Sequence, residues 1–291
     1  MSKVAIVTDS NSGIRQEEGK KLGIYVLPMP FTIDGETFYE DINLTHSEFF
    51  DKLMSGAEVF TSQPLVGDVS KLWDDVLKEY DEIVYIPMSS GLSGSCQTAI
   101  MLANEYDGKV QVVDSQRISV TQKWDVLDAI ELSKQGKSAK EIKEILEANK
   151  LNASIYITVN TLEYLRKGGR ITPAVAMLGN LLKIVPVMKL NYELGGKIDS
   201  LDKVRTVKKA NLRIIEHMVD ECKVNNHDYI FAIEHVLAEE LAQTMKQVLI
   251  DKIGECQIVV RELPSVVGAH MGVGGIGYQY IRKYEGVSWN E

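Results

Sequence analysis

The chain has 291 residues, of which 45% are hydrophobic and 25% are charged, and its formal net charge is −9. A chain of this size and composition folds around one large core or, more in keeping with its length, two of ordinary size, and its acidity excludes a general nucleic-acid binder. Its three cysteines, Cys96, Cys222 and Cys256, are widely separated and lack CxxC spacing, which indicates neither a disulfide framework nor a zinc site.

No apolar run approaches the length of a membrane span, and the N-terminus enters a strand pattern directly rather than a signal peptide. We therefore expect a cytoplasmic protein without stable membrane insertion. Charge is distributed unevenly: residues 161–213 hold eleven Lys or Arg against four Asp or Glu, a local excess of +7 that leaves −16 for the remainder. Such an excess is typical of a solvated surface, or of a patch that meets an anionic ligand or an acidic partner.

The first half of the chain alternates strand and helix patterns. Its strand-like runs are short, rich in Val and Ile and apolar on successive residues, as expected for strands covered on both faces, so they predict a parallel sheet joined by βαβ crossovers. The expected strands are 3–8, 25–29, 82–87 and 110–113, and the expected helices are 16–22, 47–55, 69–80, 95–106 and 120–135.

The second half has a different pattern, in which Gly195 and Gly196 between two strand-like runs predict a hairpin and hence some antiparallel pairing. Ser138, with Glu141 three residues on, predicts a capped helix before a crossing into a second domain. We place the domains at 1–152 and 153–291. The expected strands of the second are 154–159, 184–192, 197–204, 229–235 and 257–263, and its helices are 174–183, 206–223 and 238–253.

The strongest indication of a site is the SSGLSGS loop, residues 89–95, between a buried-type strand and an apolar helix. Glycines 91 and 94 allow close approach of the backbone, and N–H groups at the start of the helix favour a negative charge. The loop lacks the lysine and the GxxxxGK[ST] spacing of a polyphosphate loop, so it suits a small anion such as a carboxylate better than a nucleotide. The alternative is that its serines only cap the helix and fill a tight turn.

Polar residues follow three strands of the expected parallel sheet, and the carboxyl ends of such strands share one edge, where ligands bind. Asp9 and Asp114 are equally explained as caps of the helices that follow them. The residues in question are Asp9 and Ser10, Ser89 and Ser90, and Asp114 and Ser115.

A fourth loop, FTSQP, contains two hydroxyls and an amide ahead of a proline. Thr61 and Ser62 are candidates to donate to the same anion, although TSxP also describes an ordinary helix entry. In the second half, the two glycines before Arg170 stop a helix and place this guanidinium on a bend, where it can pair with a carboxylate or phosphate. Arg205 is a second cationic candidate, and His270 is distinguished by the glycines around it.

No two His or Cys residues have metal-ligand spacing, so we expect no metal, and GVGGIG lacks the βαβ context of a dinucleotide loop, so we expect no NAD. The longest apolar segment places Val175, Leu178, Leu182 and Val185 near one helical face. Core packing explains this stripe, and the lining of an apolar tunnel is the alternative.

Seven of these segments occur in one order: TDSNSG, TSQP, SSGLSGSCQ, VVDS, LEYLRKGGRI, KVRTVKKA and the glycine-flanked His270. Together, over nearly the whole chain, they closely resemble the DegV family of bacterial fatty-acid-binding proteins. The resemblance implies a two-domain α/β architecture. The N-terminal domain has a parallel sheet with helices on both faces, and the C-terminal domain has a mixed sheet with helices. A long-chain fatty acid is then buried between the two domains. The resemblance also implies that the chain presents this acid to a fatty acid kinase, which makes acyl phosphate for phospholipid synthesis.

Carried over by position, the family's carboxylate contacts fall on Thr61, Ser93 and the loop amide at Gly94. Arg170 and His270 match positions near the carboxyl group, and Arg205 matches one associated with kinase docking. The bound fatty acid is then the only ligand, with no cofactor and no catalysis by this chain. Two segments depart from the family pattern: HMGVGG at the last motif, and VVDSQRISVTQKW, which lacks the usual glycine in the helix after VVDS.

Two other functions stay open at this point. A serine-dependent hydrolase or acyltransferase would use Ser93 as nucleophile and His270 as base, although SGLSG lacks the GxSxG spacing. A kinase subunit resembling the dihydroxyacetone kinases would need a covalently reacting histidine motif, and none is evident in the sequence.

Overall fold

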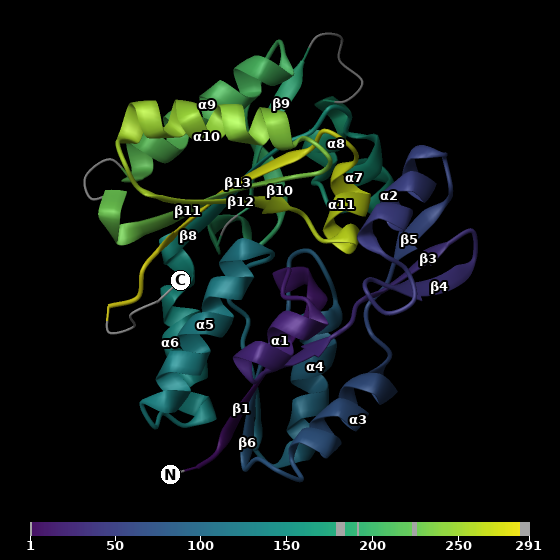
Figure 1. Cartoon of the computed structure of the whole chain (residues 1–291), viewed down its shortest axis with the longest axis vertical. Coiled ribbons are helices and arrows are strands. Elements are labelled where there is room, and N and C mark those ends of the chain that lie inside the picture. The colour runs from purple at the N-terminus through teal and green to yellow at the C-terminus, as the bar shows by residue number, and fades with distance from the viewer. Residues whose placement is uncertain (1, 179–183, 191, 223–225, 286–291) are drawn as a thin grey trace. The chain divides into compact units, whose positions relative to one another are not determined.

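The computed structural model describes residues 2–178, 184–190, 192–222 and 226–285 (Figure 1). The chain divides into two compact units. Unit 1 comprises Met1–Lys150, Pro264–Val266 and Tyr284–Glu291, and unit 2 comprises Leu151–Leu263 and Val267–Lys283.

Unit 1 is built on a four-stranded parallel sheet with the order β2-β1-β6-β7, which confirms the sequence prediction. Side chains alternate along β1: Val4 and Ile6 pack with α5 and α6, whereas Ala5 and Val7 pack with α3 and α4. Helices therefore cover both faces. The elements are β1 (Val4–Asp9), α1 (Gln16–Leu22), β2 (Tyr25–Leu27), α3 (Val66–Val76), β6 (Glu82–Ile86), α4 (Ser95–Ala103), β7 (Val110–Val112), α5 (Val120–Lys134) and α6 (Ala139–Ala148).

The predicted start of α6 is confirmed, because Ser138 and Glu141 form a reciprocal capping box. A second sheet of unit 1 was not predicted. It is antiparallel with the order β4-β3-β5 and is accompanied by α2. Its strands have three or four residues, and no residue of β4 or β5 is fully buried, so neither length nor hydrophobic alternation reveals them. The bounds are β3 (Pro30–Ile33), β4 (Glu36–Tyr39), α2 (His46–Met54) and β5 (Val59–Thr61).

Unit 2 contains a six-stranded mixed sheet with the order β10-β9-β8-β13-β11-β12. The predicted hairpin is present as the antiparallel pair β9 and β10, and α9 and α10 cover one face of the sheet. The unpredicted strand β13 lies in its interior. The bounds are β8 (Ala153–Thr158), α7 (Glu163–Gly168), α8 (Pro173–Leu178), β9 (Val185–Leu190), β10 (Ile198–Val204), α9 (Val207–Cys222), β11 (Tyr229–His235), α10 (Glu239–Ile253), β12 (Gln257–Glu262), α11 (Ser265–Met271) and β13 (Ile276–Arg282).

The predicted apolar helical face around α8 is partly wrong. Val175 and Leu178 are buried on α8, but Val185 lies in strand β9 rather than on a helix, and Leu182 lies outside the described residues. Among the described residues no helix is long and apolar enough to cross a membrane, and no three His, Cys, Asp or Glu side chains form a metal-binding group.

Helix α11 begins in unit 1 and continues into unit 2, because Pro264–Val266 belong to the first and Val267–Lys283 to the second. At its first residue, the buried Ser265 N–H donates to Glu40 Oε2 at 2.9 Å. Burial raises the pKa of Glu40, so its charge is costly and depends on this donor. The carboxylate therefore anchors the start of the helix that carries His270.

The carboxyl edge of the parallel sheet is organised by Asp9, which is completely buried. Its Oδ2 accepts the N–H of Met88 at 2.8 Å, and its Oδ1 accepts the N–H of Asn11 at 2.9 Å and the amide of Gln122 at 3.2 Å. Asp9 thus caps the 3₁₀ turn that follows β1, as one sequence alternative held, and also ties β1 to the end of β6. Asp114 caps no helix, since α5 begins after Ser119.

Asp9→Asn should lower the free energy of unfolding by about 1–3 kcal/mol, because the new NH₂ group must face either the N–H of Met88 or the donors of Asn11 and Gln122, and leaves a buried donor unpaired in either case. Urea denaturation of wild type and variant measures the difference. Asp107→Asn is the matched control, since Asp107 is exposed at a φ of 50° that Asn tolerates. Equal effects of the two substitutions would contradict the role given to Asp9.

Candidate functional site

The loop between β6 and α4 is wound tightly on itself. The carbonyl of Ser89 accepts the N–H groups of Leu92 at 3.1 Å and Ser93 at 3.2 Å, and the N–H of Ser89 donates to the carbonyl of Arg117 at 2.7 Å. Gly94 has a φ of −69°, which any residue adopts. The hydrogen bonds of Ser89 therefore fix the shape of the loop, and its φ angle does not require a glycine at position 94.

The hydroxyl groups of this loop differ in exposure. Ser89 and Ser95 are buried, whereas Ser93 is half-buried and Gly94 is exposed at the start of α4. The Ser93 Oγ accepts the N–H of Ser95 at 3.2 Å, and its own proton has no acceptor among the described residues. Together with the helix dipole at the start of α4, the Ser93 hydroxyl offers a donor and positive potential to an anion.

The TSQP loop lies beside this one within unit 1. Gln63 connects them: its Oε1 accepts the hydroxyl of Thr98 on α4 at 3.2 Å, and a Cβ at Gly94 would lie 3.6 Å from the same oxygen. Thr61 is the half-buried last residue of β5, and Ser62 is exposed, with its N–H donating to Pro30 at 3.2 Å. The structure therefore brings the two predicted hydroxyl loops together, through a residue that the sequence did not single out.

In unit 2 the structure brings Arg170 and His270 together around Gly168. Arg170 Nη1 donates to the carbonyl of Gly168, and a Cβ at Gly168 would lie 2.2 Å from His270 Nδ1. Burial and the nearby Arg170 charge lower the pKa of His270 to about 4. His270 is therefore neutral at physiological pH, and Arg170 is the only cation of this pair.

Glycines account for the close packing of the His270 segment. A Cβ at Gly272 would lie 2.5 Å from the ring of Tyr164, and a Cβ at Gly274 would lie 2.0 Å from the amide nitrogen of Asn160. Both glycines also have positive φ angles, at 70° and 83°. The glycines of HMGVGG thus leave room for Asn160, which precedes α7, and for Tyr164 within α7. The sequence shows the glycines of this segment but not which side chains they contact.

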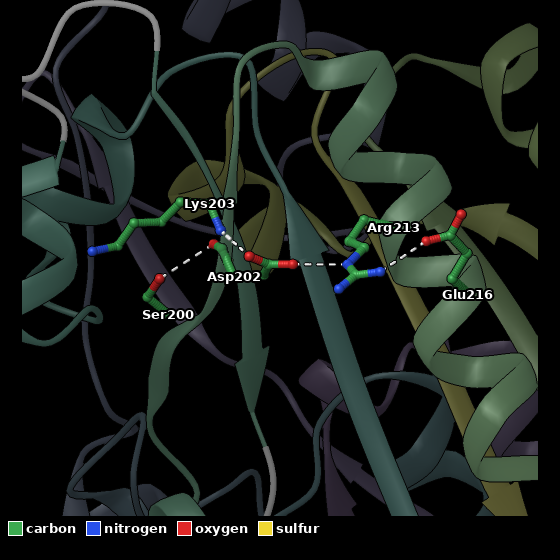
Figure 2. A network of polar contacts seen from close by, with 5 residues as sticks. All are labelled: Ser200, Asp202, Lys203, Arg213 and Glu216. Atoms are coloured by element: carbon green, nitrogen blue, oxygen red, sulfur yellow. Dashed lines mark hydrogen bonds and ion pairs between the residues drawn. The ribbon is translucent and has the colours of Figure 1, made fainter.

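Arg205 lies in the connection from β10 to α9. Figure 2 shows the polar network that joins Asp202 on β10 to Arg213 on α9. In that network Arg213 on α9 pairs with Asp202 on β10 at 2.7 Å and with Glu216 at 3.1 Å, so its charge is compensated. Arg205, Lys208 and Lys209 are exposed and have no acidic partner within the described part of the chain. The predicted local positive charge is therefore not compensated at Arg205, Lys208 and Lys209, around the start of α9.

Fold and site together define an α/β protein with hydroxyl and amide donors near the carboxyl edge of a parallel sheet. The chain belongs to the DegV family: residues 3–283 match the family model described as "Uncharacterised protein, DegV family". A DegV domain-containing protein of Staphylococcus aureus is 32% identical over 283 residues, which cover 96% of this chain and 97% of that protein.

Two solved structures share the fold over nearly their whole length. A fatty-acid-binding DegV family protein from Streptococcus agalactiae has a TM-score of 0.89 and 29% identity, covering 98% of this chain and 100% of that one. DegV from Bacillus subtilis, described as a fatty acid binding protein, has a TM-score of 0.86 and 30% identity, covering 97% and 100%. These likenesses confirm the predicted α/β fold class, with a parallel sheet and a mixed sheet, and the family resemblance.

Gly168→Ala should displace the His270 ring, because no room exists for the added methyl group, and the pKa of His270 should rise from about 4 toward its ordinary 6.5 as the ring becomes solvated. Titration of the imidazole by NMR measures this shift. Gly67→Ala on α3, where nothing lies within 4 Å of the added carbon, is the control. An unchanged His270 titration in Gly168→Ala would refute the packing described here.

Proposed function

We propose that this chain binds a long-chain fatty acid and presents its carboxylate to a fatty acid kinase, which forms the acyl phosphate used in phospholipid synthesis. In this proposal residues 1–152 hold the carboxylate through Thr61, Ser62, Ser93 and Gly94, and residues 153–291 cover the acyl chain. Arg170 and His270 act near the carboxyl group, and Arg205 contacts the kinase. The chain itself supplies binding and no catalysis.

The observation that carries the proposal is the set of uncharged donors between the TSQP loop and the start of α4. Hydroxyl and amide groups bind a carboxylate through hydrogen bonds, without a tight ion pair to a cationic side chain. One carboxylate oxygen therefore stays accessible for phosphorylation. Family membership supports the choice of ligand, as do the fatty-acid-binding relatives from Streptococcus agalactiae and Bacillus subtilis.

The geometry of Ser93 favours binding over the alternative of serine hydrolysis. A serine nucleophile needs a base that accepts its proton. Within unit 1 the hydrogen bond at the Ser93 Oγ comes from the N–H of Ser95, so the oxygen acts as an acceptor and its proton is available to a ligand. A donor of this kind suits a carboxylate.

Purified protein should bind about one palmitate per chain, and Thr61→Ala with Ser93→Ala should raise the dissociation constant at least tenfold, since a hydrogen bond to a charged acceptor is worth about 1.5–3 kcal/mol. Isothermal titration after removal of copurified lipid measures both. The double variant Thr37→Ala with Ser47→Ala removes two exposed hydroxyls elsewhere in unit 1 and should leave binding unchanged. A delipidated, folded wild type that takes up no palmitate would exclude the proposed function.

Arg205→Ala should separate presentation from binding. An exposed charge at the rim of a contact chiefly raises the association rate, whereas a pocket residue determines retention of the ligand. We expect bound fatty acid to be unchanged, while phosphorylation by the kinase becomes slower and less dependent on ionic strength. Lipid content and acyl phosphate formation are measured on the same preparation.

The control is Lys252→Ala on α10, which removes one exposed positive charge from the same unit and should leave phosphorylation unaffected. Loss of bound lipid in Arg205→Ala would place this residue in the ligand site instead.

A further inference from the structure

Residues 203–209, which we call the basic segment, run from the end of β10 into the first turn of α9 and hold four exposed cations. These are Lys203, Arg205, Lys208 and Lys209, and none of them has an acidic partner in the described part of the chain. Cations in the first turn of a helix oppose its dipole, so this placement does not serve the stability of α9. The charge is available instead to an acidic surface outside the chain.

One ion pair closes the basic segment from both sides. The Asp202 carboxylate accepts the Nε–H of Arg213 at 2.7 Å and, through its other oxygen, the N–H of Lys203 at 2.7 Å. Asp202 thus ties the backbone at the end of β10 to a side chain on the second turn of α9 (Figure 2). Because all four cations lie between residues 202 and 213, the pair restrains their arrangement.

A bulge in β10 directs Asp202 toward the helix. The pairing of β10 with β9 changes register between Ser200 and Asp202, and a bulge re-aims the side chains that follow it. Val204 packs against the core cluster to which α9 contributes, and Asp202, two residues earlier, lies on the same face of the strand. Lys203 takes the opposite face, and in Figure 2 its ammonium group points away from Arg213.

The start of α9 is fixed independently of this pair. The Thr206 hydroxyl accepts the N–H of Lys209 at 3.2 Å and so caps the helix. One turn further on, the side-chain oxygen of the buried Asn211 accepts the hydroxyl of Thr158 on β8 at 2.6 Å. Loss of the ion pair therefore frees the connection at residues 203–206 while α9 stays in place.

We propose that the basic segment is a docking surface for an acidic face of the fatty acid kinase, and that the Asp202–Arg213 pair is the positioning element that holds its shape. This inference rests on the proposed presentation of the fatty acid to that kinase, and it extends the contact from Arg205 to four cations. A segment already held in its binding arrangement binds more tightly, because a flexible segment is competent for only part of the time. The pair acts only through the basic segment.

Asp202→Ala breaks the link between strand and helix. Its matched control is Glu216→Ala, which removes an acid that contacts the same Arg213 from within α9, at 3.1 Å, and leaves the link in place. The measurement is phosphorylation of the palmitate-loaded protein by a purified bacterial fatty acid kinase with ATP. Asp202→Ala should raise the KM for the loaded protein about threefold or more with kcat unchanged, since a smaller fraction is competent to dock.

The direction of the change in KM separates positioning from charge alone. Asp202→Ala and Glu216→Ala each remove one negative charge close to the basic segment, and by charge alone each would strengthen attraction to an acidic partner and lower KM. Only loss of the link raises it. Arg213→Ala breaks the same link from the helix side, and the double variant with Asp202→Ala should have about the KM of Asp202→Ala, because both substitutions remove one interaction.

Three measurements without the kinase show whether the fold or the basic segment has changed. Bound palmitate should be equal in all variants. The midpoint of thermal unfolding should stay within about 3 °C of the wild type, because an exposed ion pair contributes little stability. Amide hydrogen exchange at residues 203–206 should become about threefold faster or more in Asp202→Ala and should not change in Glu216→Ala.

The outcomes distinguish this inference from the proposed function. If the loaded wild type is phosphorylated and Asp202→Ala has the same KM as Glu216→Ala, the role of the ion pair is wrong while presentation to the kinase stands. Equal amide exchange in the two variants leads to the same conclusion. If the wild type binds palmitate and the kinase does not phosphorylate it, presentation and this inference both fail.

Discussion

The candidate site depends on the buried carboxylate of Asp9. Burial raises its pKa, and the three donors that it accepts act in the opposite direction by stabilising the charged form. Because one of them is the N–H of Met88, Asp9 fixes where the chain leaves β6 and hence where the Ser89 loop begins. Ser89 in turn donates to Arg117, which follows β7. Three strand ends are thus joined by buried hydrogen bonds, so the loop has its shape before any ligand arrives.

The sequence predicted the large elements because their hydrophobic pattern is decided by burial. Strands β1 and β6 are largely apolar on both faces, and the buried residues on α9 recur at helical spacing, so pattern and structure agree. The small sheet of β3, β4 and β5 was missed because each strand is too short to show alternation. Strand β13 was missed because a glycine-rich segment precedes it, although its Tyr278 and Ile281 are buried.

The sequence singles out candidate residues where one segment carries its own signal, as at Ser93 and Gly94, and not where two distant segments form a contact. Gln63 gains its fixed orientation only from Thr98, 35 residues away in the chain. In the same way, the glycines around His270 were visible, but the space for its ring comes from Gly168 in another motif. Such pairings depend on tertiary contacts that composition and periodicity do not encode.

The passage of residues 264–266 into unit 1 limits how this protein can be divided. A fragment that ended at Lys150 would keep Glu40 but lose Ser265, so a half-buried carboxylate would be left without its backbone donor. A fragment that began at Leu151 would carry α11 with its first residue unanchored. Neither half of the sequence therefore contains all the residues of its own compact unit. A chimera that exchanges halves between relatives has to take the residues equivalent to Glu40 and Ser265 from the same parent.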